Sequence, residues 1–163
     1  MHTSTIQAGY AQPQSFQGQN IVIIGGSSGI GLATARQAKD AGANLFLLSR
    51  NPTRLREAAE AIGGGTPIVA DIADPQPAMF AGIERIDHLL MTAGTVRLQP
   101  LKDQSQAELQ QVVSERLIGP LLAIKAALPL LHDASSITMT SGQFASRPAA
   151  IGAVVAAAVA AVE

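Results

Sequence analysis

A glycine-rich turn is the segment of this sequence whose residue types are best suited to chemistry. Residues 25–31 read Gly-Gly-Ser-Ser-Gly-Ile-Gly and directly follow the apolar run 20–24. Glycine lets a backbone turn sharply and approach a ligand closely, because no Cβ stands in the way. A helix that begins within the turn offers free N–H groups and the positive end of its dipole to an anion. The segment therefore predicts a phosphate-binding site. The alternative is a tight turn in a domain that binds nothing.

A second candidate site follows the next predicted strand, residues 44–48. The sequence continues there as Ser49-Arg50-Asn51, with Arg54 one turn later. Dinucleotide sites that bind NAD(H) place a carboxylate near this point, where it accepts a hydrogen bond from the ribose 2′-hydroxyl. Ser49 and Arg50 instead suit a 2′-phosphate, because a guanidinium pairs with phosphate in a fork. We therefore expect NADP(H) to be preferred, with NAD(H) as the second choice. A solvated surface arginine is the alternative.

Apolar runs and helical patterns alternate along the chain and must position these residues. We expect strands at 20–24, 44–48, 66–70, 86–91 and 136–140, and helices at 30–41, 52–62, 105–129 and 151–163. Ser105 and Glu108 form a capping box that opens the long third helix. This alternation predicts an α/β, Rossmann-like doubly wound parallel sheet of strand order 3-2-1-4-5, with helices on both faces. Residues 1–19 are polar and are expected to form a mobile arm, and residues 20–163 one NAD(P)-binding domain.

Composition excludes several other classes of function. The 163 residues include 11 Lys and Arg and 12 Asp and Glu, so the formal charge is -1 and there is no basic surface for nucleic acid. There is no cysteine and the three histidines lie far apart, so we expect no metal site. The most apolar stretch, 149–162, is too short to cross a membrane. We expect a cytoplasmic protein that acts on a small-molecule substrate.

The glycine turn resembles that of the short-chain dehydrogenase/reductase family, whose motif is Thr-Gly-x-x-x-Gly-x-Gly. Gly25, Gly29 and Gly31 match it, with Ile24 in place of the threonine. The resemblance runs from about residue 18 to the end of the chain. Together with the second strand, it implies that the cofactor contacts Gly25, Ser27, Ser28, Gly29, Ile30, Gly31, Ser49, Arg50, Asp71, Ile72, Ala93 and Gly94.

Two of these positions come after the third and fourth predicted strands. By the resemblance, the Asp71 carboxylate binds the adenine amino group and the Ile72 backbone supports it. A capped turn is the alternative for Asp71. The segment Thr92-Ala93-Gly94 stands where the family has Asn-Ala-Gly, and its small residues keep the backbone near the cofactor ribose. Because Thr92 replaces the asparagine, we expect a side-chain bridge between strands to be absent.

The catalytic pattern of the family is largely missing. The resemblance places Ser141 at the serine that polarises the substrate oxygen, and Arg116 at an asparagine of the proton relay. Val155 and Val159 stand where the family has the Tyr and Lys of its acid/base pair, and valine cannot donate a proton. We expect the activity on a carbonyl or alcohol to be unusual or absent. A turn serine and an ion pair of Arg116 with a carboxylate such as Glu115 are the alternatives.

The end of the sequence suggests a truncated member of the family. Relatives continue past the Tyr-Lys helix with two more strands, whereas this sequence stops at Glu163. We expect a homo-oligomer through the helices at 105–131 and 151–163, with packing inside one chain as the alternative. Three functions stay open: an unusual NADP(H)-dependent oxidoreductase, a non-catalytic NADP(H)-binding sensor or partner subunit, and a structural domain without ligand.

Overall fold

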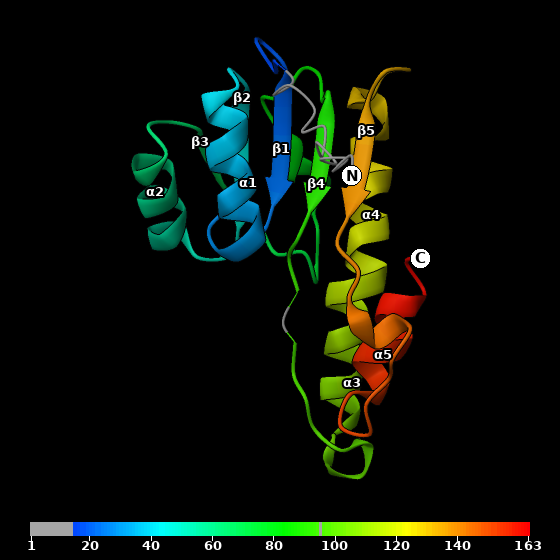
Figure 1. The fold of residues 1–163 in the computed structure, drawn as a ribbon. Coiled ribbons are helices and arrows are strands. Elements are labelled where there is room, and N and C mark those ends of the chain that lie inside the picture. The colour runs from blue at the N-terminus through cyan, green and yellow to red at the C-terminus, as the bar shows by residue number, and fades with distance from the viewer. Residues whose placement is uncertain (1–14, 95) are drawn as a thin grey trace, which may run out of the picture.

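The computed structural model describes residues 15–94 and 96–163 and is built around a five-stranded parallel sheet (Figure 1). Its strands are β1 (Asn20–Ile24), β2 (Asn44–Ser49), β3 (Thr66–Val69), β4 (His88–Met91) and β5 (Ser136–Met139). They pair in the order β3-β2-β1-β4-β5, and every pair is parallel. The predicted Rossmann-like doubly wound sheet is confirmed.

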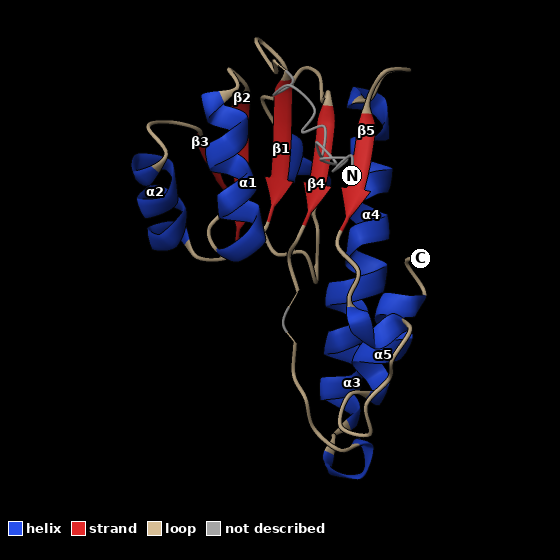
Figure 2. Ribbon diagram, viewed as in Figure 1, coloured by secondary structure: helices blue, strands red, loops and turns tan. Residues whose placement is uncertain are grey.

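Helices cover both faces of the sheet because alternate strand residues point to opposite sides (Figure 2). Ile21 and Ile23 pack with helices α1 (Gly29–Asp40) and α2 (Pro52–Ala61). Val22 and Ile24 point to the other core, which contains residues of η1 (Pro77–Phe80) and α4 (Gly119–Ala127). The carboxyl ends of β1, β2 and β4 thus lie between two packed layers, which hold the loops at these ends in place.

The predicted long helix is interrupted in the middle. It consists of α3 (Gln106–Val113), a π-helical turn η3 (Ser114–Ile118) and α4, and it ends in the short turn η4 (Leu128–Leu130). Pro120 explains the interruption, because proline has no N–H to donate to the carbonyl four residues earlier and its ring crowds that carbonyl. The N–H of Gly119 instead bonds to the carbonyl of Ser114, five residues back. The predicted capping box of Ser105 and Glu108 is present.

The last helix, α5 (Ala153–Ala160), is shorter than the predicted 151–163 and packs within the chain. It lies beside α3, beyond the carboxyl ends of the strands (Figure 1). Val155 and Val159 are buried with Val112 of α3 in a third, small core. The short turns η2 (Leu101–Asp103) and η5 (Gln143–Ala145) complete this end of the molecule. This end of the chain therefore has its own core, separate from the two on the sheet.

The predicted arm lies mostly outside the described residues, which begin at Ser15. Its last residues contact the sheet domain: the N–H of Phe16 donates to the carbonyl of Ala41 at 2.9 Å. The Phe16 ring stands edge-on to His88, with 5.3 Å between ring centroids. The packed unit therefore starts before Asn20. None of the helices within residues 15–94 and 96–163 has the length and hydropathy of a membrane span.

Candidate functional site

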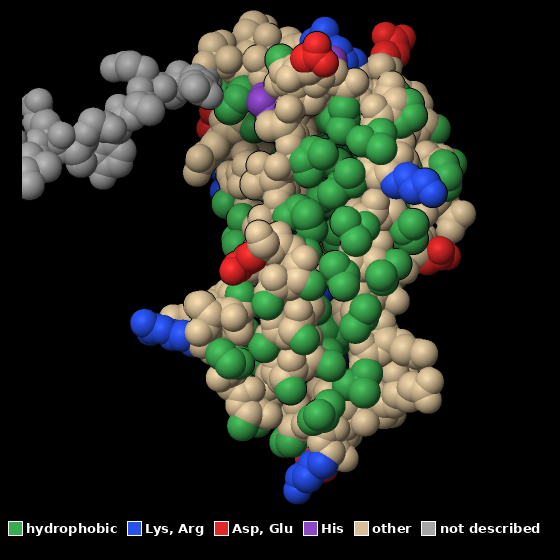
Figure 3. All heavy atoms as spheres, turned by 90° about the vertical axis from the view of Figure 1, so that its right-hand side faces the viewer, with side chains coloured by type: hydrophobic (Ala, Val, Ile, Leu, Met, Phe, Trp, Pro, Cys, Tyr) green, Lys and Arg blue, Asp and Glu red, His purple; other side chains and the backbone are tan. Residues whose placement is uncertain are grey.

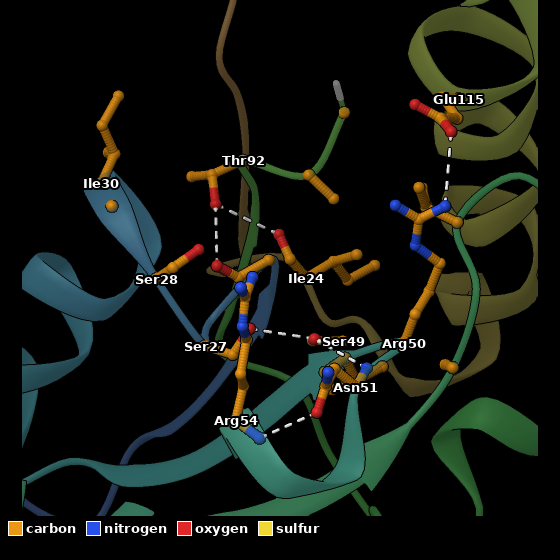
Figure 4. Close-up of a pocket in the computed structure, with 17 residues that line it drawn as sticks. Ile24, Ser27, Ser28, Ile30, Ser49, Arg50, Asn51, Arg54, Thr92 and Glu115 are labelled. Atoms are coloured by element: carbon orange, nitrogen blue, oxygen red, sulfur yellow. Dashed lines mark hydrogen bonds and ion pairs between the residues drawn. The ribbon is translucent and has the colours of Figure 1, made fainter. Parts of the chain in front are cut away.

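A cavity of about 370 Å³ opens at the carboxyl ends of β1, β2 and β4, where open α/β sheets bind their ligands. Figure 4 shows side chains from the glycine turn, the end of β2 and the π-helical turn around one space. The lining residues are Ile24, Gly25, Ser27, Ser28, Gly29, Ile30, Leu48, Ser49, Arg50, Asn51, Arg54, Ala70, Ile72, Thr92, Ala93, Gly94 and Glu115. Ten of the twelve predicted cofactor contacts are among them, all except Gly31 and Asp71.

The glycine turn forms one wall of the cavity and leaves room for a ligand. Gly25 has a φ of 97°, and a Cβ there would lie 2.6 Å from the Thr92 hydroxyl oxygen and 2.7 Å from the Ala93 nitrogen. Gly29 has a φ of 53°, and a Cβ there would meet nothing within 4 Å, so this residue faces open space. Gly31 packs behind the turn, where a Cβ would collide with the carbonyl of Gly25. Gly25 and Gly31 therefore allow close packing inside the protein, and Gly29 leaves space on the ligand side.

The start of α1 faces the same cavity and suits an anion. Ser28 is the N-cap, in an extended conformation, and its side chain forms no capping hydrogen bond. The first N–H groups of a helix have no acceptor inside the helix. The first turn of α1 carries no acidic residue that would repel a phosphate. Ser28, Gly29 and Ile30 line the cavity, so this cradle, with no Cβ at Gly29, fits the pyrophosphate of a dinucleotide.

The bridge that we expected to be absent at Thr92 exists in another form. The Thr92 hydroxyl donates to the carbonyl of Ile24 at 3.3 Å and lies 3.5 Å from the carbonyl of Gly25. The prediction was wrong because threonine, although shorter than asparagine, lies directly against the turn. Its hydroxyl ties the end of β4 to the end of β1 and holds the glycine turn in place.

Polar groups at the end of β2 connect this strand to the turn. The hydroxyl of Ser27 donates to that of Ser49 at 2.9 Å, and the N–H of Asn51 donates to Ser49 Oγ at 3.3 Å. Asn51 then caps α2, because its Oδ1 accepts from the N–H of Arg54 at 3.0 Å. Figure 4 shows the Arg54 side chain pointing from α2 into the cavity. Arg50 and Arg54 therefore bring two guanidinium groups to the same wall.

Arg50 forms an ion pair that the sequence did not reveal. Its Nη1 lies 3.4 Å from Oε1 of Glu115, whose side chain is only 3% exposed, whereas that of Arg50 is 54% exposed. The amide of Gln111 donates to the same carboxylate oxygen at 2.9 Å. We had considered Glu115 only as a partner for Arg116. The signal in the sequence is Pro120, which forces the π-helical turn that carries Glu115.

Arg116, predicted at the catalytic asparagine position, does not line the cavity itself but contacts Gly94, which does. Its Nη2 donates to the carbonyl of Gly94 at 2.8 Å. Burial lowers the pKa of the Arg116 guanidinium and the nearby Glu115 carboxylate opposes this effect, so the group stays charged at neutral pH. It is thus an anchor for the loop after β4 and a poor proton donor.

Asp71 and Ile72, the two residues predicted to contact adenine, line different cavities. Ile72 lines the cavity. Asp71 lies in the wall of a neighbouring cavity of about 480 Å³, and its Oδ1 accepts from the N–H of Ala73 at 2.9 Å. This hydrogen bond is the capped turn that we considered as the alternative for Asp71.

The remaining catalytic positions lie at α5, away from the cavity lining. Ser141 is exposed, and its hydroxyl donates to Oε1 of Glu163 at 2.7 Å and lies 3.3 Å from the carbonyl of Val159. Val155 and Val159 are 2% and 3% exposed. Helix α5, where the sequence predicts the positions of the family's acid/base pair, therefore places buried apolar side chains at both positions.

Comparison with known proteins then decides the family. The model of the short chain dehydrogenase family matches residues 19–163. This chain belongs to that family. The chain is 34% identical to a short-chain dehydrogenase/reductase, ATR9, from Stachybotrys chlorohalonatus over 91% of its own length and 66% of that protein's. It is 34% identical to 3-dehydrosphinganine reductase TSC10B from Arabidopsis thaliana over 77% of its length and 41% of the relative's.

Solved structures agree on the fold of this family member. A short-chain dehydrogenase/reductase from Brucella melitensis has a TM-score of 0.87 at 29% identity, with 91% of this chain and 66% of that chain covered. A putative short chain dehydrogenase from Escherichia coli, crystallised with NADPH, has a TM-score of 0.85 at 24% identity, with 93% and 70% covered. The chain spans 66% of the length of ATR9 and 41% of that of TSC10B. Members of this oxidoreductase family bind nicotinamide coenzymes.

Proposed function

We propose that the cavity binds a nicotinamide dinucleotide, NADP(H) in preference to NAD(H). The observation that carries this proposal is the cradle: a glycine turn with open space at Gly29, facing an uncapped start of α1 at the carboxyl ends of the strands. A turn in a domain that binds nothing needs no such space. The family membership supports the same coenzyme class.

Different lining residues would contact different parts of the coenzyme, according to their chemistry. The amides of Ser28, Gly29 and Ile30 would receive the pyrophosphate at the positive end of the α1 dipole. Ala93 and Gly94, which are small and line the far side, would leave room for the ribose next to the reactive ring. The coenzyme would supply hydride transfer, and this chain supplies binding and orientation.

The preference for the phosphorylated coenzyme rests on the residues after β2. Arg50 and Arg54 line the cavity, and β2 itself ends in Ser49, where NAD(H)-binding sites of this type place a carboxylate for the ribose 2′-hydroxyl. Guanidinium groups bind phosphate through directed, charge-assisted hydrogen bonds. Ser49 adds a hydroxyl beside them.

Turnover on a carbonyl or alcohol is proposed to be weak or absent. A positioned acid/base contributes about 10²–10⁴-fold to such a reaction. By the sequence resemblance, Val155 and Val159 take the two positions of that pair, and both valines are buried. This burial favours the second candidate function, a non-catalytic NADP(H)-binding sensor or partner subunit. Ser141 and Arg116 remain the polar candidates for a residual activity.

Coenzyme titration tests the proposal. NADPH fluorescence and calorimetry should show binding of NADPH and weaker binding of NADH. Arg50→Asp should weaken NADPH far more than NADH, because it replaces an attractive charge with a repulsive one. No binding of either coenzyme would leave the structural domain without ligand as the function. NADPH oxidation with a panel of carbonyl compounds, lost in Ser141→Ala, would identify an enzyme, and binding without oxidation would identify the sensor.

A second copy of this chain is the partner that we propose for α4. Its outer face exposes large apolar side chains, and Figure 3 shows hydrophobic side chains gathered over this side of the molecule. The exposed residues there are Leu121 and Leu122 of α4, with Ile118 and Leu128 in the turns that flank it. Helix α5, the other expected contact, already packs on α3 within the chain. Light scattering should give a dimer or larger species that Leu121→Asp dissociates, whereas a monomer in the unmodified protein would contradict the proposal.

A further inference from the structure

Glu115 is a buried carboxylate in the wall of the coenzyme cavity, and coenzyme binding as proposed above gives it no task. Its side chain is 3% exposed and lines the cavity together with Arg50 and Arg54. A buried carboxylate is costly unless partners compensate its charge. Here Arg50 and the amide of Gln111 both bond to Oε1. One of its partners is thus Arg50, the residue that we assign to the 2′-phosphate.

Arg50 and Gln111 hold Glu115 with different strength. Gln111 lies one helical turn earlier, and its amide donates at 2.9 Å. Arg50 makes one contact of 3.4 Å from a side chain that is 54% exposed, not the two parallel bonds of a strong guanidinium–carboxylate pair. Only the Arg50 side of this ion pair is exposed to solvent, and one long contact binds the guanidinium more weakly than a bidentate pair does. Arg50 can therefore leave Glu115 while Gln111 keeps the carboxylate in place.

The position of this carboxylate affects any anion that binds Arg50. Figure 4 shows the Arg50 guanidinium beside Glu115 of the π-helical turn, and both residues line the cavity. A phosphate on the same guanidinium competes with Glu115 for its N–H groups and lies near a second negative charge. NAD(H) has uncharged ribose hydroxyls in place of the 2′-phosphate. It is therefore not repelled by Glu115 and does not need the Arg50 N–H groups for a phosphate.

We propose that Glu115 is a specificity-determining residue, which lowers the preference for the 2′-phosphorylated coenzyme by competing for Arg50. The proposal rests on the proposed function, because it needs a nicotinamide dinucleotide in the cavity. It assigns the π-helical turn a task, which is to bring a charge from the helix beyond β4 to the end of β2. Sixty-five positions in the sequence separate the two residues.

Glu115→Gln isolates the charge, because the amide has the same shape and its oxygen still accepts from Arg50. Removing one negative charge a few ångströms from a phosphate should tighten NADPH binding by about tenfold at low ionic strength. Binding of NADH should change by less than about twofold. Glu84→Gln is the matched control, since Glu84 is an exposed residue before β4, at the opposite end of the strands. It should change neither dissociation constant.

Calorimetric titration of both coenzymes into the three proteins is the experiment, with circular dichroism to verify folding. A lower NADPH dissociation constant in Glu115→Gln alone supports the proposal. An unchanged or higher one in the folded variant overturns it, and a higher one would show that Glu115 positions Arg50 for the phosphate. If Glu115→Gln does not fold, Glu115→Met fills the buried place without charge, and the same gain is expected. An unmodified protein that binds neither coenzyme overturns the proposed function itself.

Discussion

Restoring the family's acid/base pair on α5 tests whether this helix faces a core or a substrate. The change is Val155→Tyr with Val159→Lys. Both valines are at most 3% exposed and pack with Val112 and Ala158. A tyrosine in place of a packed valine costs about 1–3 kcal/mol through overpacking. A lysine ammonium buried in the same core lowers the free energy of unfolding by several kcal/mol. We take about 3 kcal/mol, because the long aliphatic part of the lysine side chain allows the charge to reach toward the surface.

The lysine change alone should therefore lower the unfolding temperature by about 10 °C, since 1 kcal/mol shifts a domain of this size by about 2–4 °C. Thermal unfolding by circular dichroism measures this for Val159→Lys, for the double variant and for Ala160→Lys. The last places the same charge at an exposed position of α5 and should leave the unfolding temperature nearly unchanged.

The enzymatic readout is NADPH oxidation with a panel of aldehydes and ketones. We expect no gain in the double variant, because neither residue lines the coenzyme cavity: both belong to the small core with α3, and Val159 also borders a small separate cavity beside Arg116. A double variant as stable as the unmodified protein, with new reductase activity, would refute this reasoning. It would show that α5 turns these two positions toward the substrate.

Three further changes test other parts of the structure. Thr92→Val removes the hydroxyl that ties β4 to the glycine turn. The free energy of unfolding, measured by denaturant titration, should fall by about 1 kcal/mol, and calorimetry should show weaker coenzyme binding. If neither quantity changes, the Thr92 hydrogen bond does not hold the turn in place. Ser105→Ala removes the cap of α3 and should cost about 1 kcal/mol in the same denaturant titration, whereas a loss below a few tenths would contradict the capping box. Burial alone would raise the pKa of Asp87, but hydrogen bonds from the Asn20 N–H and His132, with Arg85 nearby, hold it below its ordinary value. Because the folded state keeps this carboxylate charged more readily than the unfolded chain, its contribution is present above the ordinary pKa, about 3.9, and is lost as the pH falls through the lower folded value. Asp87→Asn should therefore be less stable at pH 7 and lose less stability between pH 5 and 2, and parallel stability curves would contradict this.

The site residues that follow one another in the chain were predictable. The glycine turn and Ser49-Arg50 each come directly after a strand, and parallel strands bring their carboxyl ends to one edge of the sheet. The position of each group therefore follows from the order of elements. The hydrogen bond of Thr92 to Ile24 was not predictable, because it depends on the distance between Thr92 and the turn, which the residue type alone does not give.

The fold could be predicted from the sequence because local signals specify it. Continuous apolar runs form the buried strands, and glycines and the Ser105 capping box end or begin the helices. The environment of single side chains could not be predicted in this way and became known from the packing. A proline in the long helix brought Glu115 to Arg50, and packing on α3 turned Val155 and Val159 into core residues. Such contacts join residues far apart in the chain, and they depend on exact helix rotation, which hydrophobic periodicity does not specify.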